Sequence, residues 1–260
     1  MQVCVEPLTW AMCGRYLIKT PPETLAVYMG YTDRPNFPPR YNIAPTQPVP
    51  IVRLDQGQRR FALVRWGLVP SWAKDMPASL LINARAESIA DKPSFRGAFR
   101  HRRCLVPADG FYEWRVMGQG AKQPYCIRLK SGEPFAMAGI WETWMTPDGS
   151  ELDSCAIITT DANETLKPIH HRMPAILAPQ DYDRWLDQNA CPPRAALDLL
   201  RPAPDEWLEA YPVSTRVNKV ANDNPDLIEP VAPETLSPPT AVTEKQATEK
   251  QTGDDQLSLL

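Results

Sequence analysis

The chain has 260 residues, of which 43% are hydrophobic and 29 are prolines, and its net charge is −3. This composition supports one sizeable core, and so many prolines argue against a helical bundle. No apolar run is long enough to span a bilayer, and the first eleven residues lack the basic and apolar regions of a signal peptide. We therefore expect a cytoplasmic protein.

Charge and cysteine placement narrow the class of protein further. Residues 221–260 carry eight acids and two lysines, a net of −6, which leaves residues 1–220 at +3 with 26 basic and 23 acidic residues. A mildly basic body permits nucleic-acid binding without demanding it. The six cysteines have no C-x-x-C spacing and only three histidines are present, so we expect neither a metal site nor a disulfide framework.

Short apolar runs and three helical patterns follow one another along the chain. Proline-led or amphipathic patterns predict helices over 21–29, 178–188 and 192–200. Apolar runs bounded by Pro, Gly or Asp predict strands over 61–66, 103–108, 134–141, 155–160 and 173–178. Because helices do not regularly separate the strands, we expect an α+β fold with a mostly antiparallel, barrel-like β core and flanking short helices.

The ends of the chain differ from this body, which we place at residues 12–230. Residues 1–11 are interpreted as a non-native N-terminal extension. Residues 231–260 are rich in Pro, Thr, Glu and Gln, which predicts a disordered acidic tail.

Several segments are polar or aromatic where a core strand would be apolar. Glu113 stands between two aromatic residues, His170 and His171 precede Arg172 and a buried-looking strand, and tryptophans flank a Pro-Ser turn in WGLVPSW. Each feature alone has a plain structural explanation: a surface acid at a strand end, a satisfied polar cluster, and core or lid tryptophans.

Taken together, these segments are more specific. MCGRY, NIAPTQ, WGLVPSW, INARAE, RCLVPADGFYEW, AGIWE, IHHRMP and VSTRVN occur in this order, and the chain resembles the SOS response-associated peptidase (SRAP) family over residues 12–230. The resemblance implies a protein of the DNA-damage response that senses abasic sites in single-stranded DNA and shields them by a covalent bond. Three alternatives stay open: a cysteine peptidase with autoproteolytic activity, a non-covalent reader of modified DNA, and β-elimination of the strand.

The covalent reaction makes a strict demand on one cysteine. An amine condenses with the aldehyde of an opened abasic sugar, and a thiol on the same residue then closes a thiazolidine ring. Only an N-terminal cysteine has both groups, so we expect Cys13 to be the first residue of the active protein. Residues 1–12 must then be absent, either because translation starts at Met12 or because the chain is trimmed.

The resemblance also implies roles for residues at matching motif positions. Glu113 would be the acid–base group, with a pKa raised by its aromatic neighbours; His170 would be the second proton-transfer group; Asn83 would orient the amine and the aldehyde. The implied phosphate contacts, polar supports and base-stacking residues are Arg15, Arg85 and Arg216, then Asn42 and Thr160, then Trp66, Trp72 and Trp114. No metal or organic cofactor is implied.

The last five residues, QLSLL, resemble the bacterial motif that binds the replicative sliding clamp. The residues concerned are Gln256, Leu257, Leu259 and Leu260. A disordered tether with a terminal anchor would recruit the protein to replicating DNA by raising its local concentration, whereas a chance hydrophobic terminus is the simpler explanation. We expect the protein itself to be a monomer.

Overall fold

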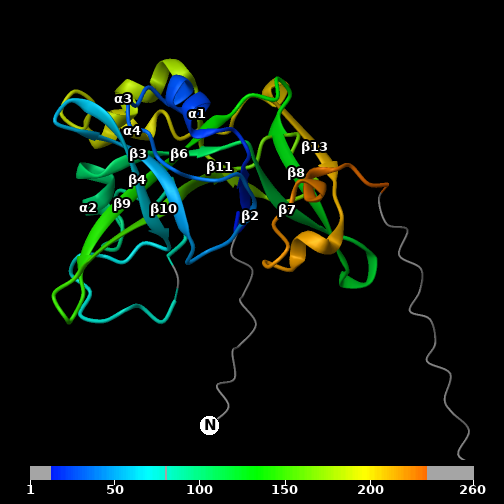
Figure 1. The fold of residues 1–260 in the computed structure, drawn as a ribbon, viewed down its shortest axis with the longest axis horizontal. Coiled ribbons are helices and arrows are strands. Elements are labelled where there is room, and N and C mark those ends of the chain that lie inside the picture. Colours follow the sequence, from blue (N-terminus) through cyan, green and yellow to red (C-terminus); the bar gives the residue numbers. More distant parts are fainter. Residues whose placement is uncertain (1–12, 80, 233–260) are drawn as a thin grey trace, which may run out of the picture.

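The computed structural model describes residues 13–79 and 81–232, which form two β-sheets that lie side by side (Figure 1). The first sheet has the strand order β13 (Leu208–Pro212), β8 (Lys122–Leu129), β7 (Gly110–Val116), β1 (Tyr16–Ile18) and β2 (Arg40–Ile43). All of its strand pairs are antiparallel.

The second sheet closes on itself. Its strand order is β11 (Arg172–Pro174), β10 (Glu151–Asp161), β4 (Gln58–Trp66), β3 (Pro48–Asp55), β6 (Arg103–Ala108), β9 (Phe135–Met145) and β12 (Ile176–Leu177), with β5 (Asn83–Arg85) beside β10. Because β10 pairs with both β4 and β9, strands β10, β4, β3, β6 and β9 form a closed ring. Only the pairs of β10 with β4 and β5 are parallel among the described strands, so the expected α+β fold with a mostly antiparallel, barrel-like core is confirmed.

The strands form where the sequence has its apolar runs, because those side chains fill the barrel. Three predicted strands fall within β4, β6 and β10. The predicted run 134–141 overlaps β9 from residue 135, and the run 173–178 is divided between β11 and β12. Every residue of β6 is buried. A Cβ at Gly139 of β9 would lie 2.7 Å from Val106 Cγ2 and 2.9 Å from Cys104 Sγ, so the close approach of β6 to β9 requires glycine there.

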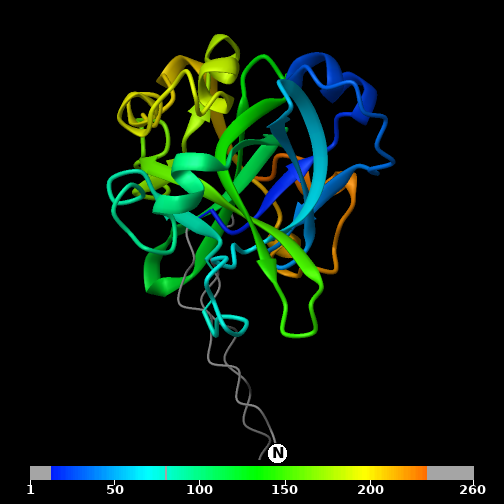
Figure 2. The same cartoon turned by 90° about the vertical axis from the view of Figure 1, so that its left-hand side faces the viewer.

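The helices are short and lie at one end of the barrel. Figures 1 and 2 place α1 (Pro22–Met29), α3 (Tyr182–Leu186) and α4 (Pro193–Leu197) at the end opposite the β9–β10 hairpin. These three helices fall within the predicted segments, whereas α2 (Arg96–His101) was not predicted. Helix α1 buries Leu25 and Met29 and ends at Gly30, whose φ of +73° favours glycine.

Single 3-10 turns complete the described chain: η1 (Gly118–Gly120), η2 (Pro179–Asp181), η3 (Asp205–Trp207), η4 (Thr215–Asn218) and η5 (Pro225–Ile228). The Val231 N–H donates to the carbonyl of Pro212, so the folded body reaches residue 231. The predicted extension at 1–11 and the predicted clamp-binding residues 256–260 lie outside the described residues. In the part that is described, no helix has the length and apolarity to cross a membrane.

Candidate active site

Cys13 forms a short hydrogen bond with a buried glutamate on the neighbouring strand. Cys13 directly precedes the first sheet, and its backbone nitrogen donates a hydrogen bond of 2.6 Å to Glu113 Oε1. Glu113 lies on β7, and Tyr112 N of the same strand donates to the Arg15 carbonyl, so residues 13–15 run along β7. Cys13 is 3% exposed and Glu113 is 4% exposed. The contact therefore joins the nitrogen of Cys13 to a carboxyl that is almost free of solvent.

Burial governs the protonation of this pair. It raises the pKa of Glu113 to about 7, although hydrogen bonds from Cys13 and Trp114 act in the opposite direction. Burial also raises the pKa of the Cys13 thiol, and the Glu113 carboxylate adds to this effect. At neutral pH, the thiol is therefore protonated and the carboxyl is divided between its acid and base forms. The expected rise in the pKa of Glu113 is present.

A buried arginine adds positive charge to the site. The guanidinium of Arg172, on β11, donates to both carboxylate oxygens of Glu87 at 2.7 and 2.9 Å, to Asp161 at 2.7 Å and to the Thr159 carbonyl at 2.7 Å. Burial lowers its pKa, but the pairs with Glu87 and Asp161 raise it by more, so Arg172 stays charged. This charge lowers the pKa of the Cys13 thiol, partly offsetting burial and Glu113. Arg172 thus acts on the Cys13–Glu113 pair from the second sheet.

Sequence reasoning assigned no function to Arg172. The available signal was an arginine directly before a buried strand, which requires several acceptors if its charge is to be buried.

His170 is half-buried beside this arginine. Its Nδ1 lies 3.1 Å from the Arg172 nitrogen, which donates to it in one neutral tautomer, and 3.3 Å from the Arg172 carbonyl oxygen, which accepts from it in the other. Burial lowers the pKa of His170, and the charges of His171 and Arg172 add to this effect, so the neutral form dominates at pH 7. The ring of the exposed His171 lies over that of His170, with 4.4 Å between centroids. His170 is therefore a neutral imidazole at pH 7 whose Nδ1 faces the backbone of Arg172.

Strand β5 brings the INARAE motif to the same end of β10. Asn83 pairs with Ile157 and Arg85 with Thr159, while Thr159 also pairs with Pro174 of β11. The side chain of Asn83 is half-buried and that of Arg85 is exposed. Residues of INARAE and IHHRMP, far apart in the sequence, therefore flank the same residues of β10.

In addition to the exposed Arg85, three of the predicted DNA-binding residues are accessible on loops or strand edges. Trp72 is 65% exposed on the loop after β4, and Trp144 Nε1 donates to the Ala73 carbonyl at 2.6 Å, which holds this loop. Trp114 is half-buried, and its indole N–H donates to Asn218 Oδ1 at 2.7 Å. Arg216 is exposed and forms an ion pair with Asp226.

The other predicted DNA-binding residues are less open. Thr160 is buried on β10. Arg15 is half-buried, and its guanidinium donates to Asn42 Oδ1 at 2.9 Å and to the Val217 carbonyl at 2.8 Å. These bonds hold Arg15 close to the protein surface beside Cys13.

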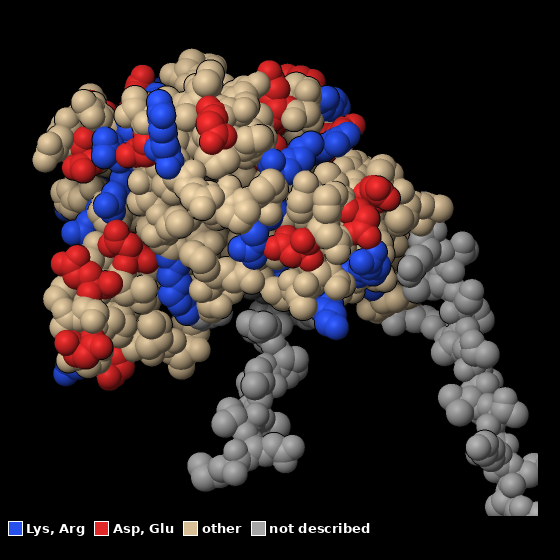
Figure 3. Space-filling view, viewed as in Figure 1, with Lys and Arg blue, Asp and Glu red and all other residues tan. Residues whose placement is uncertain are grey.

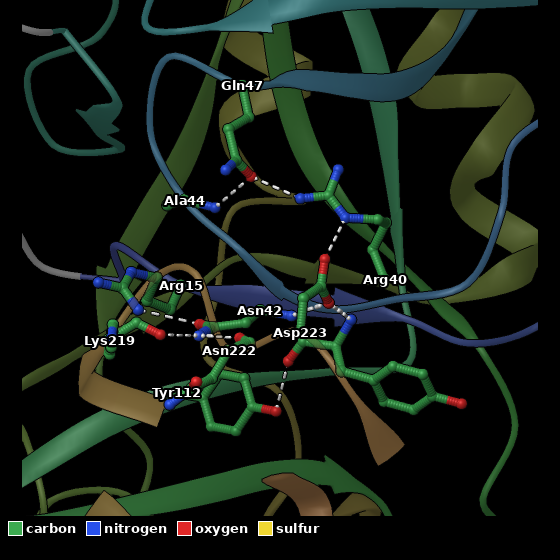
Figure 4. Close-up of polar contacts among 10 residues, drawn as sticks. Arg15, Arg40, Asn42, Ala44, Gln47, Tyr112, Lys219, Asn222 and Asp223 are labelled. Atoms are coloured by element: carbon green, nitrogen blue, oxygen red, sulfur yellow. Dashed lines mark hydrogen bonds and ion pairs between the residues drawn. The ribbon is translucent and has the colours of Figure 1, made fainter. Parts of the chain in front are cut away.

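Two of the predicted roles need correction. Trp66 is fully buried, donates its indole N–H to the Ile82 carbonyl at 3.0 Å and packs edge-on against Tyr16, so neither face is open to a base. Asn42 is also fully buried, and its amide group is engaged by Arg15 and by three backbone carbonyls. Both residues are structural: Trp66 fills the core, and Asn42 joins β2 to the end of the domain (Figure 4).

Charge and shape alone do not mark the site. On the face seen in Figure 3, lysine and arginine are interspersed with aspartate and glutamate rather than gathered in one patch. A shallow hollow of about 560 Å³ lies elsewhere and contains none of the predicted site residues; its lining consists of Thr46, Pro48, Leu63, Val64, Arg65, Glu151, Leu152 and Asp153. Among residues 13–79 and 81–232, no group of three His, Cys, Asp or Glu side chains could hold a metal ion.

The fold and the site define an α+β protein with a closed five-stranded barrel and a separate five-stranded antiparallel sheet, at which a buried cysteine–glutamate pair lies. The family model described as SOS response associated peptidase (SRAP) matches residues 12–220, and the chain belongs to this family.

Curated relatives and a solved structure agree with this assignment. The chain is 40% identical to the abasic site processing protein YoqW of Bacillus subtilis, over 84% of this chain and 99% of that protein. It is 36% identical to the abasic site processing protein HMCES of Gallus gallus, over 85% of this chain and 78% of that protein. A crystal structure of a protein from Bacteroides thetaiotaomicron is similar with a TM-score of 0.77 and 28% identity, over 85% of this chain and all of that one.

Proposed function

We propose that this protein processes abasic sites in single-stranded DNA by forming a covalent bond through Cys13. The relatives are named abasic site processing proteins, which supports the abasic site as the target. The 2.6 Å hydrogen bond between the Cys13 nitrogen and Glu113 supports a reaction at that nitrogen. The reaction requires that Cys13 be the first residue of the active chain, because its nitrogen is an amine only then. A free α-amine has a pKa of about 7.7–8.0, so part of it is neutral at cellular pH.

The reaction balances with groups of this protein and the sugar alone. The neutral amine adds to the C1′ aldehyde, and loss of one water gives an imine. The Cys13 thiol then adds across the C=N bond, so that sulfur binds C1′, the thiol proton passes to nitrogen and a thiazolidine forms. No electrons are gained or lost overall.

Glu113 is suited to carry the protons of these steps. As a carboxylate it accepts a proton from the amine, and as an acid it returns one to the departing hydroxyl group. In the 260-residue chain, burial raises the pKa of Glu113 to about 7, so burial favours a proton on this group at pH values where an exposed glutamate has lost it. In the tautomer that has its proton on Nε2, His170 donates to the sugar ring oxygen as the ring opens, and Asn83 orients the amine and the aldehyde.

The DNA contacts are proposed from the accessible predicted residues. Arg15, Arg85 and Arg216 would bind phosphates, while Trp72 and Trp114 would stack on bases beside the lesion. Because phosphate contacts release counterions, affinity is expected to fall steeply with salt.

Denaturing electrophoresis with an abasic single-stranded oligonucleotide tests the proposal. A chain that starts at Cys13 is expected to give a shifted band, which is lost in Cys13→Ala and in a chain whose Cys13 nitrogen remains acylated. Glu113→Gln is expected to slow the reaction about 100-fold with nearly unchanged DNA affinity. A shift in the acylated chain would refute the ring closure, and cut DNA without a shift would indicate β-elimination instead.

The same contact supports a second candidate, autoproteolysis at Cys13. Glu113 lies within hydrogen-bond reach of the nitrogen that would leave when the bond between residues 12 and 13 breaks. Intact-mass analysis of the purified 260-residue chain tests this. Time-dependent loss of residues 1–12 that Glu113→Gln abolishes would support autoproteolysis, and an unchanged mass would exclude it.

A further inference from the structure

Two polar segments that the proposed chemistry does not use, 41–47 and 213–218, meet in the structure. Figure 4 shows Asn42 of β2 at the centre of this meeting. Its Nδ2 group donates to the carbonyls of Val217 at 3.1 Å, Lys219 at 3.1 Å and Asn222 at 2.8 Å. One buried side chain therefore binds three backbone carbonyls within residues 217–222, near the end of the domain.

The carboxylate of Asp223 also joins the end of the domain to β2. Its Oδ1 accepts hydrogen bonds from Tyr41 N at 2.5 Å and Asn42 N at 3.0 Å, and its Oδ2 accepts one from Arg40 Nε at 2.5 Å. The side chains of Arg40 and Asp223 are about three-quarters buried. We call residues 214–223, held on β2 by Asn42 and Asp223, the clasp.

The clasp contacts residues on both sides of the Cys13–Glu113 pair. Arg15, two residues after Cys13, donates to the Val217 carbonyl at 2.8 Å and to the Asn218 carbonyl at 3.3 Å. Trp114, next to Glu113, donates its indole N–H to Asn218 Oδ1 at 2.7 Å. The segment that carries the nitrogen and the strand that carries the carboxyl are thus both anchored to Asn218.

We propose that the clasp is a positioning element for the active site, in which Asp223 and Asn42 set the geometry between the Cys13 nitrogen and the Glu113 carboxyl. The inference rests on the proposed function for its catalytic consequence. Direct proton transfer needs heavy atoms about 2.6–3.2 Å apart, and the observed distance is 2.6 Å. Releasing residues 217–218 frees Arg15 and Trp114 to shift, and a misplacement of about 1 Å can lower a rate about 100-fold.

The test compares Asp223→Ala and Asp223→Asn with a matched control, Asp33→Asn. Asp33 makes similar contacts with β4, because it accepts from Phe61 N at 2.9 Å and pairs with Arg60 at 3.1 Å. In single-turnover crosslinking by chains that start at Cys13, at saturating abasic DNA, Asp223→Ala is expected to lower the rate about tenfold or more, with the half-saturating DNA concentration within about twofold of wild type. Asp33→Asn is expected to stay within about twofold in both. Asp223→Asn keeps one oxygen acceptor and serves as the foldable variant should the alanine variant unfold.

A second readout needs no DNA. The hydrogen bonds from Cys13 lower the pKa of Glu113, so a displaced Cys13 leaves that pKa higher than in the wild type. Titration of the Glu113 carboxyl by NMR in the full chain is expected to show this rise in the Asp223 variants and not in Asp33→Asn. If the wild type crosslinks, either readout remaining at its wild-type value overturns the positioning role. If the wild type does not crosslink, the proposed function fails and the titration alone decides whether the clasp positions the pair.

Discussion

Replacing Glu113 with glutamine measures how much the buried carboxyl changes the free energy of unfolding, independently of its role in the reaction. Burial raises the pKa of this group from 4.5 to about 7, even though hydrogen bonds from Cys13 and Trp114 lower it in part. At about 1.4 kcal/mol for each tenfold change in proton affinity, the rise corresponds to about 3 kcal/mol. This is a large part of the stability of an ordinary domain.

The sign of the effect follows from proton binding. Between pH 4.5 and about 7, the folded protein keeps a proton on Glu113 that the unfolded chain has released. The free energy of unfolding therefore falls as the pH rises through this window, and the whole contribution is lost above the folded pKa. Glutamine does not titrate, so the stability of the wild type relative to Glu113→Gln is expected to fall by about 3 kcal/mol from about pH 4 to pH 8.

Urea unfolding followed by tryptophan fluorescence measures this difference at several pH values. The 260-residue chain is the sample to use, because the nitrogen of Cys13 is then a peptide nitrogen. In a chain that starts at Cys13, the nearby ammonium group is expected to lower the pKa of Glu113 and shrink the difference. Parallel pH dependences for the wild-type and glutamine chains would refute the reasoning, because they would mean that the carboxyl is not destabilised by burial.

Three further predictions concern single side chains. Arg103→Lys is expected to destabilise the fold by about 3 kcal/mol in urea unfolding, because the buried guanidinium donates to four backbone carbonyls that an ammonium cannot all reach; a change below about 1 kcal/mol would contradict this. Trp72→Ala is expected to weaken binding to single-stranded DNA by about 1–3 kcal/mol in fluorescence anisotropy without altering stability, whereas Trp66→Ala is expected to cost about 3–5 kcal/mol of stability; the reverse pattern would restore Trp66 as a stacking residue. Cys13→Ser at the N-terminus is expected to give a stable DNA adduct only when borohydride reduces the imine, and a stable adduct without reductant would exclude the thiol from ring closure.

Local pattern was sufficient to predict four of the five barrel strands, β4, β6, β9 and β10, because buried strands need apolar runs of limited length, but it did not predict β3. It was insufficient for α2, whose six residues, RGAFRH, are too few to show a helical period. The two tryptophans of WGLVPSW show where pattern was available but not used. Val64 and Trp66 alternate with Arg65 along β4 and point to the buried side, whereas Trp72 follows the end of the strand.

The polar contacts of the site were harder to predict because their partners are remote in sequence. Arg172 pairs with a carboxylate 85 residues earlier, and Asn42 binds a carbonyl 180 residues later. No local period relates such positions. The order of the motifs indicated that these segments contribute to function. Only the fold shows that Asn42 is a buried residue that joins two segments, whereas Arg85 is exposed.

The residues of the site lie far apart in the sequence, and this separation determines when the site can form during synthesis of the chain. The hydrogen-bond partner of the Cys13 nitrogen, Glu113, is synthesised 100 residues later, and the carbonyl of Val217 that binds Arg15 is synthesised 202 residues after Arg15. A ribosome delivers these partners in turn, so a nascent chain has its cysteine long before it has the acid. Under the proposed function, an unfinished copy therefore carries Cys13 without its acid–base partner, and the assisted reaction with aldehydes begins only after the domain has folded.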